Sequence, residues 1–211
     1  ATGGGGGSDS GGGGGGGECT PTRLWVNDHW QLALECGGVY GVHLGHEDLM
    51  ELLCKDDDSF DQLADSGLRL GLSTHSYSEL CSARAVHPSY VALGPIYPTE
   101  SKKDVGFGPQ GREAVERWSE LLATDGKGNI GGIPLVVIGG INSDAQARDL
   151  CAGGADSVAV IGAMSEKAPE VAAEGLGGVV ERWNNAISGA KRARALNSGF
   201  LGITLGGAEE A

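Results

Sequence analysis

The chain has 211 residues, of which 40% are hydrophobic, and a formal net charge of -13. This length suits one α/β domain, and the 15 Lys and Arg residues form no long basic run, which argues against a nucleic-acid partner. No apolar run reaches the roughly 20 residues of a membrane-spanning helix, so no membrane partner is expected. Five cysteines without CxxC spacing indicate an intracellular setting and argue against a disulfide framework or a zinc site.

Composition divides the chain into three parts. Residues 1–22 hold two glycine tracts, at 3–7 and 11–17, and cannot bury apolar surface, so we expect a flexible leader or linker. This segment lacks the basic or amphipathic character of a targeting peptide. Residues 23–192 are expected to form the folded domain, and residues 193–211 are expected to form a flexible C-terminal tail.

Short apolar runs alternate with segments of helical spacing in the folded part. In chain order, the predicted elements are a strand at 24–26, a helix at 30–34, a strand at 40–44, a helix at 47–54, a strand at 68–72, a helix after Ser76, a strand at 90–96, a helix at 109–122, a strand at 135–138, a helix ending at Cys151, a strand at 157–163 and a helix at 168–190. This repeat predicts an α/β fold with a parallel sheet.

Local signals support particular elements. Ser76 is followed three residues later by Glu79, which is the spacing of a capping box at a helix start. Asn142 or Ser143 is expected to cap the helix that follows the fifth strand. The segment Leu135–Ile138 is continuous and rich in β-branched residues, which predicts a strand buried on both faces.

The polar and glycine-rich stretches all follow predicted strands. A (β/α) barrel places its active site at the carboxyl ends of its strands, where these stretches would lie. A doubly wound open sheet follows a similar rule, so the periodicity alone leaves both architectures open.

Two carboxylates follow the first two strands. Asp28 comes directly after the first strand, and Asp48 comes shortly after the second. Adjacent parallel strands would bring both to one edge, where their oxygens could hold Mg²⁺ together with water and a phosphate. Alternatively, Asp48 only caps or charges the first turn of a helix.

Hydroxyl and cationic side chains follow the next two strands. Ser73-Thr74-His75 could bind phosphate or act as a base, or could be ordinary loop residues before a helix. Thr99, Ser101 and Lys102 cluster hydroxyl donors with a positive charge and therefore predict an anion site, although exposed lysines are common on any surface.

Glycines follow the last two strands. Gly139-Gly140 and Gly162 would let backbone N–H groups approach a phosphate closely. In barrels, the loops after the last two strands commonly form such a site. The alternative is a tight turn from strand to helix, which also favours glycine.

Several segments together resemble the thiamine-phosphate synthase (thiamine-phosphate pyrophosphorylase) family. The resemblance covers about Leu24 to Met164, in the family's order. The segments that carry it are "VNDHWQLAL", "YGVHLGHEDL", "LGLSTHSYSEL", "PSYVALGPIYPTESK", "PLVVIGGIN" and "GADSVAVIGAM". It implies a (β/α)₈ barrel that joins hydroxymethylpyrimidine diphosphate to hydroxyethylthiazole phosphate, releasing pyrophosphate.

The resemblance also implies roles for individual residues. Asp28 and Asp48 resemble the Mg²⁺ ligands, and Asn27 resembles a contact to the pyrimidine diphosphate. Ser73 and Lys102 resemble the contacts to pyrophosphate and are the expected catalytic residues. Contacts to the thiazole phosphate are implied for Thr99, Ser101, Gly140, Ile161 and Gly162.

The chain departs from the family at three places. His46 stands where the family usually has Gln, and Gly162 stands where it often has Ser. The first two βα units, which carry Gln, Arg and Lys ligands of the diphosphate, have no counterpart before Arg23. We therefore expect a partial barrel of six strands that is inactive alone, or that is fused to or complemented by a hydroxymethylpyrimidine kinase or a missing N-terminal segment.

Two other functions stay open. A related thiazole tautomerase needs no diphosphate site, and His75 could serve as its acid–base group. A non-catalytic relic would bind thiazole phosphate without turnover. For any of these functions, the expected location is intracellular, in the cytoplasm or a plastid.

Overall fold

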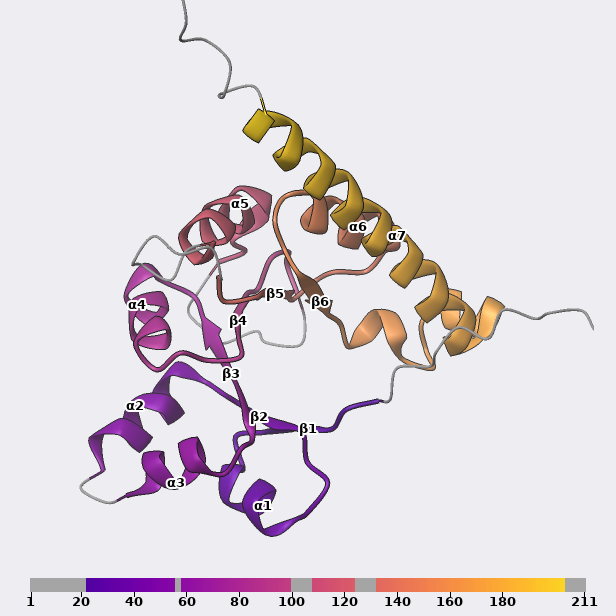
Figure 1. Cartoon of the computed structure of the whole chain (residues 1–211). Coiled ribbons are helices and arrows are strands. Elements are labelled where there is room, and N and C mark those ends of the chain that lie inside the picture. Colours follow the sequence, from indigo (N-terminus) through magenta and orange to yellow (C-terminus); the bar gives the residue numbers. More distant parts are fainter. Residues whose placement is uncertain (1–21, 56–57, 100–107, 124–131, 204–211) are drawn as a thin grey trace, which may run out of the picture.

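The computed structural model describes residues 22–55, 58–99, 108–123 and 132–203. Its sheet contains six strands, all paired in parallel in the order of the sequence (Figure 1). The strands are β1 (Trp25–Asn27), β2 (Gly41–Leu44), β3 (Arg69–Thr74), β4 (Tyr90–Leu93), β5 (Leu135–Ile138) and β6 (Ser157–Ala159). Within the described residues, β1 and β6 do not pair, so the sheet is an open half-barrel, as predicted.

Helices follow the strands and cover one face of the sheet. They are α1 (Trp30–Glu35), α2 (His46–Cys54), α3 (Ser59–Asp65), α4 (Tyr77–Ala85), α5 (Gly111–Leu122), α6 (Asp144–Ala152) and α7 (Pro169–Ile203), with a 3₁₀ turn, η1 (Gly162–Met164). Helix α3 was not predicted. None of the described helices is long and apolar enough to cross a membrane.

The two faces of the sheet differ in burial. Leu44, Leu72, Val91 and Leu135 lie at one level of the register and are buried against the helices. Their neighbours along the strands face the concave side, and in β5 these are the half-buried Val136 and Ile138. The prediction that β5 is buried on both faces is therefore wrong, because the helices cover only the convex face.

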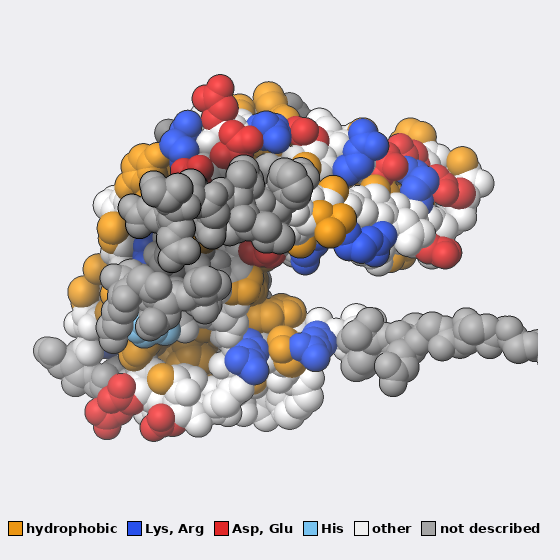
Figure 2. All heavy atoms as spheres, turned by 45° about the horizontal axis from the view of Figure 1, so that its top comes forward, with side chains coloured by type: hydrophobic (Ala, Val, Ile, Leu, Met, Phe, Trp, Pro, Cys, Tyr) orange, Lys and Arg blue, Asp and Glu red, His pale blue; other side chains and the backbone are white. Residues whose placement is uncertain are grey.

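The concave side is open in the space-filling view. Figure 2 shows a wide hollow between the part of the molecule that carries β1 and the part that carries α7. Hydrophobic atoms lie along its wall, and Lys and Arg side chains lie on its rim. Side chains on the concave face can therefore meet a ligand.

Helix α7 extends further than predicted. It ends at Ile203 rather than near Ala190, and its direction changes at Gly175, which has a φ of 74°. Arg194 donates to the carbonyl oxygens of Cys151 and Ala155, so this part of the chain packs on the domain. Residues 193–203, which were expected to form part of a flexible tail, are helical, and residues 1–21 and 204–211 lie outside the described residues.

Two predicted helix caps are present. Ser76 Oγ accepts a hydrogen bond from the backbone N–H of Glu79, and Ser143 Oγ accepts one from the backbone N–H of Gln146. These caps satisfy N–H groups that a first helical turn leaves unpaired. They fix where α4 and α6 begin, next to the carboxyl ends of β3 and β5.

Replacing Ser143 by Ala is expected to lower the free energy of unfolding by about 1 kcal/mol, because α6 loses its cap. Urea unfolding would measure the loss. The control is Ser82→Ala: Ser82 lies inside α4 and donates to the Ser78 carbonyl, so its hydroxyl caps no helix end. Equal losses in the two variants would show that the cap contributes nothing.

Candidate active site

The end of β1 places two predicted site residues at the carboxyl edge of the sheet. Asp28 has a φ of 63°, and its backbone N–H donates to the His43 carbonyl oxygen of β2 at 2.9 Å. The Asn27 side-chain amide donates to Asp28 Oδ2 at 2.6 Å. Both side chains are exposed, so the carboxylate is held by its neighbour and remains open to solvent.

Asp48 lies on the next unit, in the first turn of α2. Its Oδ2 accepts a hydrogen bond from the backbone N–H of Gly45 at 3.2 Å, as expected for a helix-capping aspartate. The side chain is exposed, and no contact to its second oxygen is recorded among the described residues. Asp48 therefore caps its helix and still has an oxygen for another partner.

The two carboxylates fit Mg²⁺ as a donor set. Mg²⁺ prefers oxygen ligands and usually keeps several waters, with one or two carboxylates and a substrate phosphate completing its shell. Asp28 and Asp48 follow neighbouring strands and would supply such carboxylates. Among the described residues, no group of three or more His, Cys, Asp or Glu side chains could hold a metal, so a shell here would need water or phosphate.

Ser73 lies on the concave face of β3 in a network that the sequence did not predict. His43 of β2 places Nε2 2.8 Å from Ser73 Oγ and Nδ1 2.8 Å from Tyr90 Oη of β4. Its ring stacks on Tyr90, with the two planes 15° apart. Three adjacent strands thus contribute one hydrogen-bonded chain to the site.

The two residues after Ser73 have local structural partners. Thr74 is fully buried, and its hydroxyl donates to the Ala92 carbonyl oxygen. His75 Nδ1 lies 3.1 Å from Glu79 Oε2, and the same carboxylate oxygen accepts from the backbone N–H of His75. Thr74 therefore belongs to the core, whereas His75 is a half-buried imidazole held by a carboxylate.

The loops after β4 and β5 are bonded to each other. The backbone N–H of Tyr97 donates to the Gly139 carbonyl oxygen at 3.0 Å, and a Cβ atom on Gly140 would lie 2.6 Å from the Pro98 carbonyl oxygen. Thr99 directly follows Pro98, the residue whose carbonyl oxygen lies beside Gly140. Ser101 and Lys102 lie outside the described residues.

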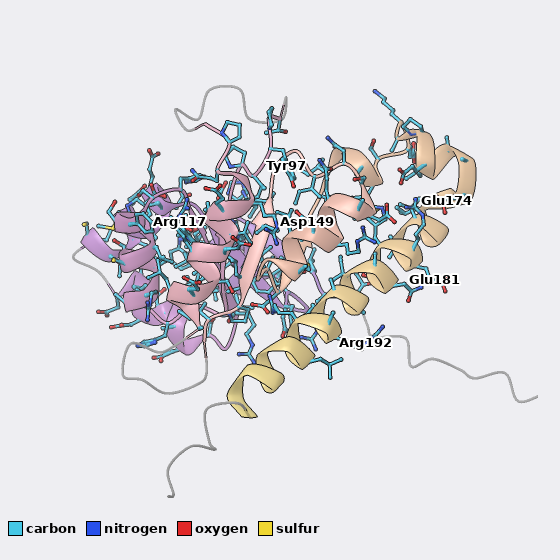
Figure 3. All side chains as sticks on the ribbon, turned by 90° about the horizontal axis from the view of Figure 1, so that it is seen from above. Tyr97, Arg117, Asp149, Glu174, Glu181 and Arg192 are labelled. Carbon is cyan, nitrogen blue, oxygen red and sulfur yellow. The ribbon has the colours of Figure 1, made fainter. Side chains whose placement is uncertain are left out.

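Tyr97 is half-buried beside this loop pair. Burial raises the pKa of its phenol above the usual value, and the Asp149 carboxylate adds to the increase while the Arg112 guanidinium opposes it. In Figure 3, Tyr97 and Asp149 lie on adjoining elements. The phenol is therefore neutral and can donate or accept a hydrogen bond at the edge of the site.

A hollow of about 530 Å³ opens after β5 and β6. It is lined by Asn142, Gly162, Ala163, Ser165, Lys167, Ala168, Pro169 and Glu170. Gly162 was a predicted phosphate contact, and its predicted neighbour Ile161 is 69% exposed. The sequence reasoning missed Lys167, whose charge close after the last strand was the available signal.

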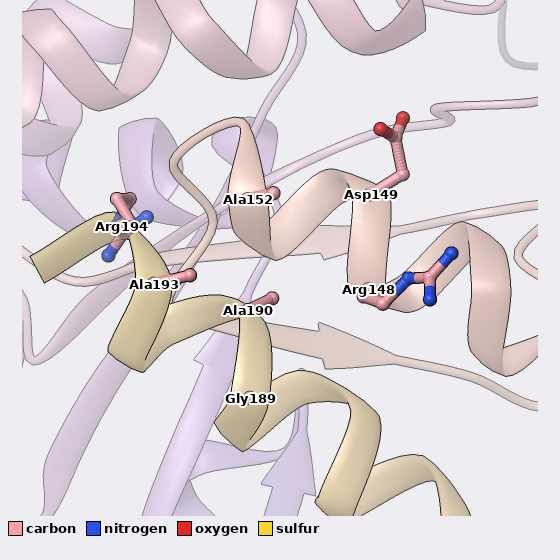
Figure 4. A pocket seen from close by; sticks show the side chains of 7 residues that line it. All are labelled: Arg148, Asp149, Ala152, Gly189, Ala190, Ala193 and Arg194. Carbon is pink, nitrogen blue, oxygen red and sulfur yellow. The ribbon is translucent and has the colours of Figure 1, made fainter. Parts of the chain in front are cut away.

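A second hollow, of about 370 Å³, lies between α6 and α7 (Figure 4). It is lined by Arg148, Asp149, Ala152, Gly189, Ala190, Ala193 and Arg194. None of these is a predicted site residue, and Arg194 is already bonded to the Asp156 carboxylate at 3.0 Å. This hollow lies between helices on the convex side and is separate from the carboxyl edge.

These features define a parallel βα half-barrel whose carboxyl edge carries carboxylates, hydroxyls and glycine turns suited to a phosphorylated ligand. The thiamine monophosphate synthase family model matches residues 19–164. The chain belongs to this family.

Individual relatives agree with the family assignment. A thiamine-phosphate synthase from Neisseria meningitidis serogroup B is 43% identical over 147 residues, which cover 70% of this chain and 63% of the relative. One from Serratia proteamaculans is 44% identical over 144 residues, covering 68% of this chain and 60% of the relative. The chain thus spans about three fifths of the length of these relatives.

A solved structure supports the fold. The thiamine phosphate pyrophosphorylase from Pyrococcus furiosus superposes with a TM-score of 0.56 at 23% identity. The match covers 80% of this chain and 68% of that structure. At this identity the likeness concerns the fold, and the chemistry has to be argued from the residues of this chain.

Proposed function

We propose that this chain carries out the thiamine-phosphate synthase reaction, joining hydroxymethylpyrimidine diphosphate to hydroxyethylthiazole phosphate. The observation that supports it best is the common edge of the sheet. Asp28 follows β1, Gly140 follows β5, and Ser73 lies near the end of β3, so parallel pairing brings all three toward that edge. Two phosphorylated substrates need such a collection of donors and metal ligands.

In the proposed reaction, the C–O bond of the pyrimidine methylene breaks, and its electron pair leaves with pyrophosphate. Ser73 and Lys102 would donate hydrogen bonds to the leaving oxygens as their charge develops. Asp28 and Asp48 would hold Mg²⁺, which supplies further neutralisation of that charge. The thiazole nitrogen then bonds to the methylene carbon, so no protein nucleophile is required.

The thiazole phosphate would bind at the other half of the edge. Backbone N–H groups near Gly140 and around Ile161 and Gly162 are the proposed phosphate donors. The hydroxyls of Thr99 and Ser101 are proposed as further donors. Lys167 lines the same hollow as Gly162 and would replace the hydroxyl that relatives often carry there. Anchoring this phosphate holds the thiazole nitrogen close to the methylene carbon.

Replacing Lys167 by Ala is expected to raise KM for thiazole phosphate about tenfold, because one charge-assisted hydrogen bond is lost. KM for the pyrimidine diphosphate should stay the same. Steady-state kinetics with each substrate varied in turn would measure both. Arg192→Ala is the matched control, since Arg192 is an exposed cation on the outer side of α7 (Figure 3). A uniform loss in both variants would contradict a specific contact.

Product formation by the purified chain tests the proposed function. Both substrates are supplied with Mg²⁺, and thiamine phosphate and pyrophosphate are quantified. We expect equal amounts of the two products, and none when EDTA removes the metal. Thiazole phosphate that binds without turnover, both with this chain alone and after the segment described below is added, would contradict the proposal and favour a non-catalytic binding protein.

The chain spans about three fifths of the length of its relatives, and this bears on the test. In the family resemblance, Gln, Arg and Lys ligands of the diphosphate belong to two βα units that precede the matched region. We propose that another segment or a fused hydroxymethylpyrimidine kinase supplies them, inside the cytoplasm or a plastid. Addition of that segment should then raise turnover.

A thiazole tautomerase activity is the second candidate, favoured by the pairing of His75 with Glu79 at 3.1 Å. A carboxylate beside an imidazole suits an acid–base group that moves a proton on the thiazole ring. Isomerisation of thiazole phosphate without any pyrimidine substrate would support it. Loss of that isomerisation in His75→Gln, with binding retained, would assign the proton transfer to His75.

A further inference from the structure

Four residues on the concave face lie at one level of the sheet. The register pairs Asn27 with His43, His43 with Gly71, and Gly71 with Tyr90. Paired residues of parallel strands point to the same face, so the side chains of His43 and Tyr90 flank a position without a side chain. A Cβ atom on Gly71 would collide with the Tyr90 ring, so glycine is what lets the two rings meet.

His43 thereby contacts Ser73, a residue that is predicted to bind the substrate. Its two ring nitrogens lie 2.8 Å from Tyr90 Oη and 2.8 Å from Ser73 Oγ. Trp25 packs edge-on against Tyr90, with ring centroids 5.0 Å apart. The imidazole is therefore fixed by stacking on one side and by hydrogen bonds at both nitrogens.

The positions of the protons in the hydrogen bonds between Tyr90, His43 and Ser73 follow from the chemistry of these three side chains. Burial raises the pKa of Tyr90, so its phenol is neutral and carries one proton. A phenol is a stronger donor than a neutral imidazole, which favours the tautomer in which Tyr90 donates to Nδ1 and the ring proton lies on Nε2. Nε2–H donates to Ser73 Oγ, which leaves the serine's own proton for an outside acceptor.

We propose that His43 is a positioning residue that aims the Ser73 hydroxyl at the diphosphate oxygens of the pyrimidine substrate, an inference that rests on the proposed function of this edge. With the opposite tautomer, the Ser73 hydroxyl would donate its hydrogen bond to His43 Nε2. It could then only accept a hydrogen bond from the substrate. A diphosphate offers acceptors and no donors, so the orientation decides whether the hydroxyl binds it. Tyr90 fixes the tautomer of His43, and His43 in turn fixes the direction in which the Ser73 hydroxyl donates.

Two substitutions of His43 separate positioning from packing. The amide of Gln can reach the place of Nε2 and donate to Ser73, whereas the amide of Asn reaches only the place of Nδ1. Isothermal titration with inorganic pyrophosphate and Mg²⁺ measures the anion site without turnover. We expect His43→Asn to weaken binding about tenfold, and His43→Gln to restore it to within about threefold of the wild type.

A double-mutant cycle with Ser73→Ala completes the test. Because His43 acts through Ser73, adding His43→Asn to Ser73→Ala should cause no further loss. Tyr90→Phe should weaken binding in the Ser73 protein and not in the Ser73→Ala protein. Circular dichroism of each variant separates loss of fold from loss of the hydroxyl's orientation.

Several results would overturn the inference. These are wild-type affinity in His43→Asn, an additive loss in the double variant, or a wild-type chain that binds no pyrophosphate. The proposed function fails separately, when pyrophosphate binds with the expected dependence on His43 and no thiamine phosphate is formed. The two ideas can therefore be rejected independently.

Discussion

Replacing Asp28 by Asn is expected to lower kcat/KM for thiamine phosphate formation on the order of 10²-fold, because a neutral amide is a poorer ligand for Mg²⁺ than a carboxylate. The apparent affinity for Mg²⁺ should fall with it. Asp48→Asn should have a similar effect. If both residues hold one ion, the double variant should be little worse than the weaker single variant.

The control for this series is Asp65→Asn. Asp65 is an exposed carboxylate at the end of α3, just before β3, so it lies toward the amino edge of the sheet. It should leave turnover and Mg²⁺ dependence unchanged. Full activity in Asp48→Asn, with only a small loss of stability, would show that Asp48 serves α2 as a cap and nothing else.

Replacing Gly140 by Ala should lower the free energy of unfolding by about 1–3 kcal/mol. Gly140 has a φ of 69°, and an added Cβ would lie 2.6 Å from the Pro98 carbonyl oxygen and 2.7 Å from Tyr97 Cβ. The loops after β4 and β5 would have to separate. Binding of thiazole phosphate should weaken as well, because both loops are proposed to hold it.

Gly162→Ala provides the comparison for this stability effect. A Cβ atom on Gly162 would have nothing within 4 Å, so its unfolding free energy should change by less than about 0.5 kcal/mol. Thermal and urea unfolding of both variants measure the difference. Equal stabilities would mean that the close approach at Gly140 is readily relieved and that the predicted separation of the two loops does not occur.

The strands were predictable because each is a short apolar run that polar or glycine residues end. Helix α3 was missed because it buries only Leu63 and lies directly after an acidic turn. The length of α7 was underestimated, and the part around Arg194 is held by contacts with residues 38 to 43 positions earlier. Such long-range contacts leave no periodic pattern in the sequence.

The positions of several proposed site residues, though not their roles, were predictable from the strand–helix repeat. Residues that follow strands, such as Asp28 and Gly140, stand out because their place in the repeat predicts the edge. His43 was missed because it lies within a strand, and its partners Ser73 and Tyr90 are 30 and 47 residues away. Only the register of the sheet reveals that they meet.

The division between the two edges of the sheet has a use in engineering the protein. The connection from α1 to β2 runs through Gly37 and Gly38 at the amino edge, and added Cβ atoms there would meet nothing within 4 Å. A fluorescent reporter or an affinity tag inserted at this point would lengthen a loop and leave the strand register intact. The carboxyl edge would keep its ligands, so a tagged or immobilised chain should bind substrate as the untagged chain does.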